Sequence, residues 1–224
     1  MKTIKILSFL SLSAIIILAS CKKDKSTGDD EIQTTYQLSQ DQAAGESIGD
    51  DVNSLFLEAS VNAGLATGRL SGIAETNNSL SCASVTVTPG NFPKTMVIDF
   101  GAGCTSIDGV LRAGKINIVI SDSVHHNGAT AVMNFDNYFV ENYKVEGTIT
   151  WVNTSTPNGI SWTRDIADGK ITAPGGNYYW LHVGSKTVQQ TAGASTPYNL
   201  LDDVYTITGN HTVTNPLGKS RTAT

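Results

Sequence analysis

The 224-residue chain has little charge and few aromatic side chains. Only 16% of its residues are charged and 7% are aromatic, whereas 40% are hydrophobic. No cluster of Lys or Arg exists outside the extreme N-terminus, which excludes a nucleic-acid partner because phosphate binding needs a basic stripe. The hydrophobic share is too high for a disordered protein. Thr is abundant, with 26 residues, and it suits half-exposed strands. The composition therefore predicts a Thr-rich β protein.

Residues 1–20 are expected to be a lipoprotein signal peptide. Lys2 and Lys5 precede an apolar run, Ile6 to Leu18, that is too short to span a membrane. The run ends in Leu18-Ala19-Ser20-Cys21, which is similar to the bacterial lipobox, where cleavage occurs before a lipid-carrying Cys. The similarity implies lipidation of Cys21 and a membrane anchor at that residue. The alternative is a plain secretory signal whose next residue happens to be Cys.

Residues 21–37 are expected to form a flexible tether. The segment from Lys22 to Glu31 is polar and charged and has no apolar side chain. Its Lys-rich start and acidic end are similar to the export signals that follow the lipidated Cys in Bacteroidota. That similarity implies the outer membrane and, further, its outer face. An ordinary solvated linker is the alternative.

Residues 38–80 are expected to be a helical segment. Apolar residues recur three or four positions apart, as one face of a helix requires: Ile48, Val52, Leu55, Phe56 and Ala59. Several glycines weaken this helix, so it is expected to need a sheet to pack on. The stretch from Gly45 to Gly49 matches the hydrolase pattern G-x-S-x-G, but that motif needs a strand before it. It is therefore interpreted as part of the helix.

Residues 81–224 show the two-residue period of half-buried strands. One apolar face is formed in each of three segments, by Met96, Ile98 and Phe100, by Ile116, Ile118 and Ile120, and by Val145, Gly147, Ile149 and Trp151. Turn signals separate the segments at short intervals, among them Asp108-Gly109, Asn127-Gly128, Glu141-Asn142, Asp168-Gly169 and Gly175-Gly176. Short loops force antiparallel neighbours. The predicted fold is mainly all-β, an antiparallel up-and-down meander that is curled or two-layered, with one N-terminal helix packed on it.

A further pattern starts at Cys82 and covers most of the chain after it. It comprises Phe92 to Cys104, Asp108 to Ile116, Phe135 to Tyr138 and Val145 to Thr148. This pattern resembles a family of uncharacterised Bacteroidota outer-membrane lipoproteins. The resemblance implies anchoring and a β-rich fold, and it carries no known activity. The family pattern continues beyond the equivalent of Thr224, which implies that this chain is a fragment or a shortened member.

Cys82 and Cys104 are the two cysteines that remain if Cys21 carries lipid. Two thiols in an oxidising envelope compartment favour a disulfide. Two free buried thiols are one alternative. A metal pair is the other, although no CxxC motif or nearby His supports it. The sequence predicts no metal site and no cofactor.

Tyr178, Trp180 and His182 are the candidate ligand-binding residues. Strand alternation puts them on one face, and Leu181 and Val183 on the other, which is expected to face the core. An aromatic face open to solvent would stack on sugar rings, whereas packing in the core or between layers is the alternative.

Ser123 is a candidate O-glycosylation site. Asp122-Ser123-Val124 is similar to the Asp-Ser/Thr-aliphatic sites at which Bacteroidota attach O-glycans, and its place just before a turn would keep it accessible. His125 and His126 follow at the predicted hairpin tip, where adjacent side chains point to opposite faces and can hardly bind one ion.

No nucleophile, paired acid or metal set is found at workable spacing, so the sequence argues against an enzyme. The leading hypothesis is a non-enzymatic, lipid-anchored binding or structural module of the outer membrane, facing the cell exterior in its bolder form. Its expected partners are the membrane, through Cys21, and a glycan or an envelope protein. The alternative hypothesis is a subunit of a surface fibre or adhesin, in which an incomplete sheet accepts a strand from a partner.

Overall fold

The computed structural model describes residues 27–66, 78–196 and 201–224. One long helix, α1 (Thr27–Asn62), is followed by ten strands: β1 (Ser84–Val87), β2 (Lys94–Asp99), β3 (Cys104–Thr105), β4 (Leu111–Ile120), β5 (Thr130–Val140), β6 (Tyr143–Asn153), β7 (Ser161–Thr172), β8 (Tyr179–Ala192), β9 (Val204–Thr214) and β10 (Ser220–Ala223). Cys21 and the rest of the lipobox lie outside the described residues. Among the described residues, no helix combines the length and the apolar character needed to cross a membrane.

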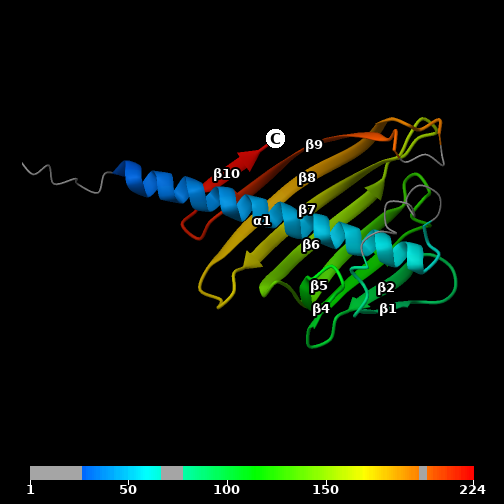
Figure 1. Cartoon of the computed structure of the whole chain (residues 1–224), viewed down its shortest axis with the longest axis horizontal. Coiled ribbons are helices and arrows are strands. Elements are labelled where there is room, and N and C mark those ends of the chain that lie inside the picture. The colour runs from blue at the N-terminus through cyan, green and yellow to red at the C-terminus, as the bar shows by residue number, and fades with distance from the viewer. Residues whose placement is uncertain (1–26, 67–77, 197–200) are drawn as a thin grey trace, which may run out of the picture.

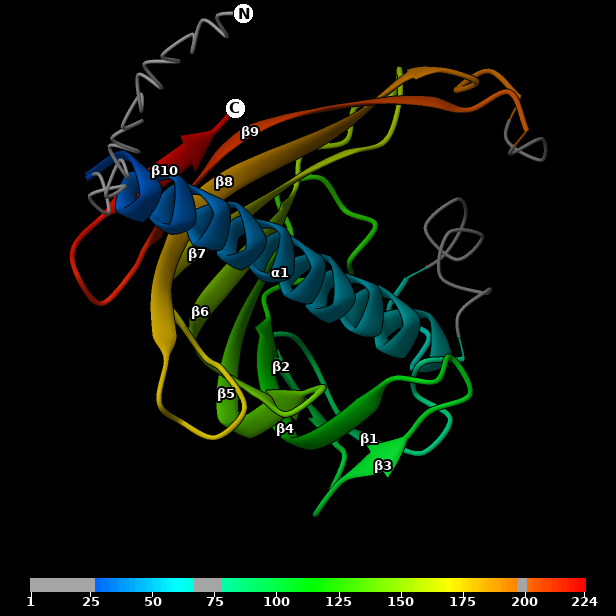
Figure 2. The same ribbon diagram turned by 60° about the vertical axis from the view of Figure 1, so that its left-hand side comes forward.

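The strands form a single antiparallel sheet in the order β1-β2-β4-β5-β6-β7-β8-β9-β10, with β3 paired to β4. Every neighbouring pair along that order is antiparallel, as the short predicted loops require. The sheet is not closed, and it curls around α1, which lies along its concave side (Figures 1 and 2). The predicted meander with one N-terminal helix is therefore confirmed.

The curl has a local cause in the glycines of the central strands. The pairing register slips in β4 between Ala113 and Lys115, in β6 between Glu146 and Thr148, and in β7 before Gly169. Gly114 and Gly147 stand at the first two slips with φ of 77° and 115°, which other residues rarely adopt. Neighbouring bulges of this kind bend a sheet in one direction. Asp168-Gly169, predicted as a turn, is part of such a bulge inside β7.

The hydrophobic core lies between the concave face and the C-terminal half of α1. Val52, Leu55 and Phe56 of the helix are fully buried, and the ring of Phe56 meets that of Trp151 edge to face at 5.4 Å. The three predicted apolar faces in β2, β4 and β6 point into this core: Met96, Ile98, Phe100, Ile116, Ile118, Ile120, Val145, Ile149 and Trp151 are all buried. This part of the amphipathic pattern is confirmed.

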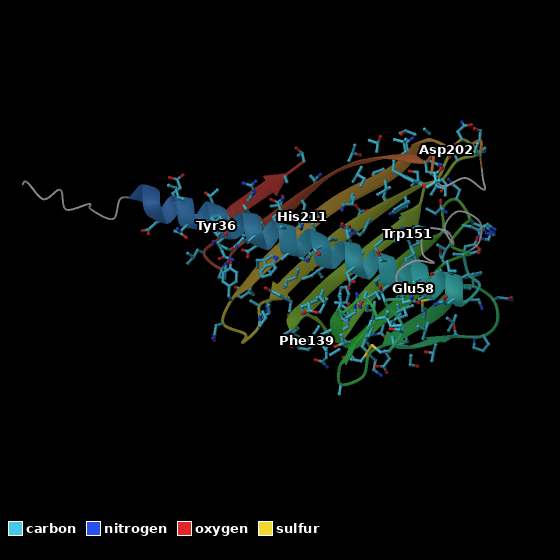
Figure 3. The ribbon with its side chains drawn as sticks, in the orientation of Figure 1. Tyr36, Glu58, Phe139, Trp151, Asp202 and His211 are labelled. Atoms are coloured by element: carbon cyan, nitrogen blue, oxygen red, sulfur yellow. A yellow bond between two sulfur atoms is a disulfide. The ribbon has the colours of Figure 1, made fainter. Side chains whose placement is uncertain are left out.

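The helix begins earlier than the sequence pattern suggested. The sequence predicted a flexible tether up to residue 37, but α1 already begins at Thr27, so the tether prediction is wrong for residues 27–37. Ile32 and Tyr36 are 63% and 61% exposed because these first turns extend past the edge of the sheet (Figures 1 and 3). Without packing there, the apolar period that signals a buried helix is absent.

Candidate functional site

The middle of α1 meets strands β7 and β8 through charged side chains. Glu46 and Asp50 lie one turn apart on the helix and face Arg164 of β7 and Lys186 of β8. Arg164 Nη1 donates to Asp50 Oδ1 at 2.7 Å, and Lys186 Nζ lies 3.0 Å from Glu46 Oε2 and 2.8 Å from Asp50 Oδ1. Two acids and two bases therefore balance one another at this contact.

A pair of histidines continues this cluster beneath the helix. His182 of β8 and His211 of β9 are both only 3% exposed. His182 Nδ1 lies 3.2 Å from His211 Nε2. His211 Nδ1 lies 2.9 Å from Glu46 Oε1, a close contact without hydrogen-bond alignment. Figure 3 shows His211 alongside α1. The two rings share a hydrogen bond between His182 Nδ1 and His211 Nε2, and the carboxylate of Glu46 lies on the other side of His211.

The pKa values of this cluster follow from its burial. Contact with His211, opposed by burial and supported by Lys186, lowers the pKa of Glu46 to about 2. Burial, together with the nearby His211 and Arg164, lowers the pKa of His182 to about 4, although Glu46 acts in the opposite direction. At neutral pH, therefore, Glu46 is an anion and His182 is a neutral imidazole.

Four glycines make room for these buried polar side chains. A Cβ atom on Gly45 would lie 3.1 Å from His211 Cε1, and one on Gly49 would lie 3.1 Å from the guanidinium carbon of Arg164. On the sheet, a Cβ on Gly169 would lie 2.4 Å from His182 Cδ2, and one on Gly184 would lie 3.2 Å from His211 Cδ2. The glycines of the G-x-S-x-G stretch are therefore packing positions within α1, where helix and sheet approach closely.

A groove of about 350 Å³ opens beside this cluster, between α1 and strands β7 to β9. Its floor is a cross-strand row of Trp162, Val188 and Ile207, which are register partners on the three strands. Its rim carries polar groups from the helix and the sheet, together with Tyr205: Asp50, Asn53, Ser54, Arg164 and Lys186. Ile207 is 63% exposed, so the floor is open to solvent.

Two polar atoms of groove residues are buried without a hydrogen-bond partner among the described residues. They are Arg164 Nε, on a side chain that is only 4% exposed, and Asn53 Oδ1. One is a donor and the other an acceptor. Buried polar atoms are nearly always paired, so these two are among the exceptions in the described part of the chain.

The predicted ligand face of β8 is oriented the other way round. Trp180 and His182 are 2% and 3% exposed, whereas Leu181 and Val183 are 46% and 48% exposed on the convex face. The prediction that Leu181 and Val183 face the core is wrong. Alternation identifies the two faces of a strand but not the one that is covered, and here the helix covers the polar and aromatic face. Trp180 packs near Tyr143 and Tyr178, with ring centroids at 6.0 and 6.1 Å.

Tyr178 is also bonded to the helix. Its hydroxyl donates to Asp41 of α1, and burial and this carboxylate raise its pKa. Tyr178, Trp180 and His182 therefore form no platform open to solvent, and the open-platform version of the carbohydrate prediction is wrong for these residues. The core-packing alternative describes Trp180 and His182.

The structure also places the other sequence-predicted residues. Cys82 and Cys104 are joined by the predicted disulfide, which ties the segment before β1 to β3. Ser123 is half-buried, and its Oγ donates to the carbonyl of Leu65 at 2.9 Å, so it is less accessible than predicted. In the described part of the chain, no three His, Cys, Asp or Glu side chains are grouped to hold a metal ion.

A second charged cluster joins the same stretch of the helix to β4, on the other side of the core. Arg112 of β4 has a side chain that is 1% exposed, and its guanidinium bonds to Asp51 of α1 and, at 2.9 Å, to Asp108. Hydrogen bonds to these carboxylates raise the pKa of Arg112 in spite of its burial. This cluster fixes the helix to β4, with two carboxylates bound to a single guanidinium.

Comparison of the chain with protein-family models, with curated proteins and with solved structures gives no match. The groove is therefore interpreted from its own chemistry. Sequence reasoning missed Glu46, Asp50, Arg164 and Lys186. The sequence places Glu46 and Asp50 one helical turn apart on one face, but it contains no local signal for their partners Arg164 and Lys186.

Proposed function

We propose that this protein is a non-enzymatic, lipid-anchored envelope module that binds a neutral carbohydrate unit in the groove between α1 and strands β7 to β9. The observation that carries the proposal is the groove itself. It combines an apolar floor at Trp162 with polar side chains along its rim, among them Asn53 and Arg164. Small-molecule sites have this composition, mostly apolar with a few convergent polar groups.

The charges of the groove favour a neutral ligand. Arg164 and Lys186 are already paired with Asp50 and Glu46, so neither sign is in excess. An ionic ligand would have to break these pairs and leave a charge unpaired, which is costly. A sugar hydroxyl both donates and accepts hydrogen bonds without carrying a charge, so it suits a rim of polar groups whose charges are already paired.

The aromatic floor favours a flat ring ligand. Trp162 is half-buried, so one part of its indole is held by the sheet while another part borders the groove. The apolar face of a pyranose ring can lie on such a surface while its hydroxyls reach the rim. Tyr205 and Ile207 extend the same surface along β9.

The burial of the two histidines argues against acid–base catalysis at the groove. His182 and His211 are the best acid–base candidates near the groove, but both lie under α1 with exposures of 3%. A general base must reach the proton that it removes, directly or through one water molecule. Binding without chemistry is therefore the function that the site supports best.

A lipid on Cys21 would anchor the protein in the outer membrane, and the protein would face the cell exterior. The residues Leu18 to Cys21 support it, as does the resemblance to Bacteroidota lipoproteins. Because α1 begins at Thr27, only residues 22–26 separate the proposed lipid from a helix of 36 residues, about 54 Å long. Such a helix would hold the groove at a defined distance from the membrane.

Ligand binding is tested by titrating the protein with oligosaccharides of glucose, mannose, galactose and N-acetylglucosamine while following tryptophan emission and heat of binding. At least one series should bind, Trp162→Ala should weaken that binding roughly tenfold or more, and Trp162→Phe should retain most of it. Tyr179→Ala, on the exposed convex face, is the matched control. If no saccharide binds, or if both alanine variants lose affinity equally, the groove is not a carbohydrate site.

Anchoring is tested separately with Cys21→Ser. Wild-type protein should fractionate with the outer membrane and incorporate labelled fatty acid, and the variant should do neither. Membrane fractionation of the wild type without any lipid label would contradict the proposal.

A further inference from the structure

A second cavity, of about 240 Å³, lies along α1 and is separate from the carbohydrate groove. Its helical wall consists of residues that recur with the helical period and therefore share one face of α1: Ala44, Ser47, Ile48 and Asp51. Its other wall comes from the residue before β4 and from the hairpin of β5 and β6: Val110, Val140, Glu141 and Tyr143. Among the described residues, none lines both this cavity and the groove, so the two are different sites.

The walls of this cavity are mostly apolar and are held in place by the core. Ile48 and Val140 are buried in the core, and Val110 is packed against it. The half-buried ring of Tyr143 meets that of Trp180 edge to face at 6.0 Å. Because an apolar cavity of about 150 Å³ can hold benzene, this larger cavity has room for a six-membered ring and a short substituent.

The charged side chains that line this cavity are all acids. Its described lining contains the carboxylates of Asp51 and Glu141 and no Lys, Arg or His. Asp51 shares the single guanidinium of Arg112 with Asp108, so one negative charge remains in that cluster. Glu141 is bound by the backbone N–H of Leu111, and no base in the described part of the chain pairs with it. The cavity therefore lies in an excess of negative charge, unlike the groove.

Glu141 is fixed at the rim of the cavity by a tight turn. Glu141 and Asn142 have φ of 49° and 65° and connect β5 directly to β6, which is the geometry of a two-residue hairpin loop. The Glu141 N–H donates to the carbonyl of Leu111 at 2.9 Å, and the Leu111 N–H donates to Glu141 Oε1 at 2.7 Å. A Glu residue at positive φ is uncommon, and such conformations are concentrated at functional sites. The carboxylate is therefore held in a defined position before any ligand arrives.

We propose that this cavity binds a small organic cation, namely a primary ammonium on an apolar body the size of a six-membered ring. The apolar body packs against Ile48, Val110 and Val140, and the ammonium donates a hydrogen bond to the carboxylate of Glu141. An anion would be repelled by Glu141 and Asp51, and a neutral ligand would gain no charge-assisted hydrogen bond. This site does not depend on the carbohydrate groove, where acids and bases balance.

The test uses three probes with the same ring and different charges: cyclohexylmethylammonium, cyclohexylmethanol and cyclohexanecarboxylate. In calorimetric titrations of the protein at neutral pH, the ammonium should bind roughly tenfold or more tighter than the alcohol, and the carboxylate should not bind measurably. In NMR spectra of the same titration, amide shifts should change at Val110, Val140 and Tyr143 but not at Trp162 and Ile207, which separates this site from the carbohydrate groove.

Two variants test the role of the carboxylate. Glu141→Gln removes the charge but keeps an oxygen that can accept from the Leu111 N–H, so it should lower the affinity for the ammonium to that for the alcohol. Glu146→Gln is the matched control, because its carboxylate is paired with Lys144 outside the cavity, and it should leave the affinities unchanged.

Three results would overturn the proposal. One is that the ammonium binds no tighter than the alcohol, or that none of the probes binds. Another is an equal loss of ammonium affinity in Glu141→Gln and Glu146→Gln. The third is a set of amide shifts confined to Trp162 and Ile207, which would place the cation in the groove instead.

Discussion

Acid should destabilise this protein through His182 as the pH falls below about 6.5. The pKa of His182 is about 4 in the folded protein because the ring is buried, against 6.5 for an ordinary histidine. Between these two pH values, His182 therefore binds a proton in the unfolded chain but not in the folded protein. The contribution is fully favourable above pH 6.5 and is lost as the pH falls from about 6.5 to about 4.

The expected magnitude follows from these two values. Between pH 7 and pH 5 the unfolded state gains most of its proton while the folded state gains little, which lowers the free energy of unfolding by about 2 kcal/mol. The window stops at pH 5 because Glu46, with a pKa of about 2 through its contact with His211, loses its own contribution only below about pH 4.5. The groups facing the ring are His211, Arg164 and Glu46.

Urea unfolding followed at pH 7, 6 and 5 measures this loss for the wild type and for His182→Asn. The Asn side chain keeps a polar atom toward His211 but does not titrate, so the variant should be less stable at pH 7 and should lose about 2 kcal/mol less than the wild type by pH 5. His125→Asn, at an exposed position, is the control and should follow the wild-type profile. Parallel pH profiles for the wild type and His182→Asn would refute the reasoning.

Three further predictions concern stability, measured by urea unfolding. Trp180→Ala should cost about 3 to 5 kcal/mol because the indole is only 2% exposed, and half-buried Trp162→Ala should cost less than half as much. Replacing both Cys82 and Cys104 by Ser should cost about 3 kcal/mol, since the bridge closes a loop with a sequence separation of 22. Arg112→Ala should cost about 3 to 5 kcal/mol because it leaves the carboxylates of Asp51 and Asp108 unpaired, whereas Lys115→Ala, in the exposed pair with Asp99, should leave the unfolding midpoint nearly unchanged. Equal effects within either pair of variants would contradict the burial argument.

Much of the fold can be predicted from local pattern. The buried faces of β2, β4 and β6 follow from a two-residue period, because side-chain direction in a strand is fixed by the backbone alone. The order of helix, then meander, follows from the change of period and from the short loops. For the strands and the loops, neighbouring residues contain the whole signal. The disulfide was predicted differently, from the number of cysteines and an expected oxidising compartment.

The candidate site depends on contacts that no local pattern contains. Glu46 meets Lys186 and His211, which lie far away in the sequence, and the spacing gives no hint of these partners. The glycines at 45 and 49 look unfavourable in a helix, and only the closeness of His211 and Arg164 explains them.

The sequence by itself determined which residues of each strand share a face and where most of the turns fall. The tertiary structure alone decided which face of β8 is covered, since Trp180 and Leu181 alternate equally well in either orientation and only the position of α1 buries the first and exposes the second. It also decided that a helix of mixed polarity packs on a sheet, because the charges of Glu46 and Asp50 are neutralised by bases that only the curled sheet brings beneath them.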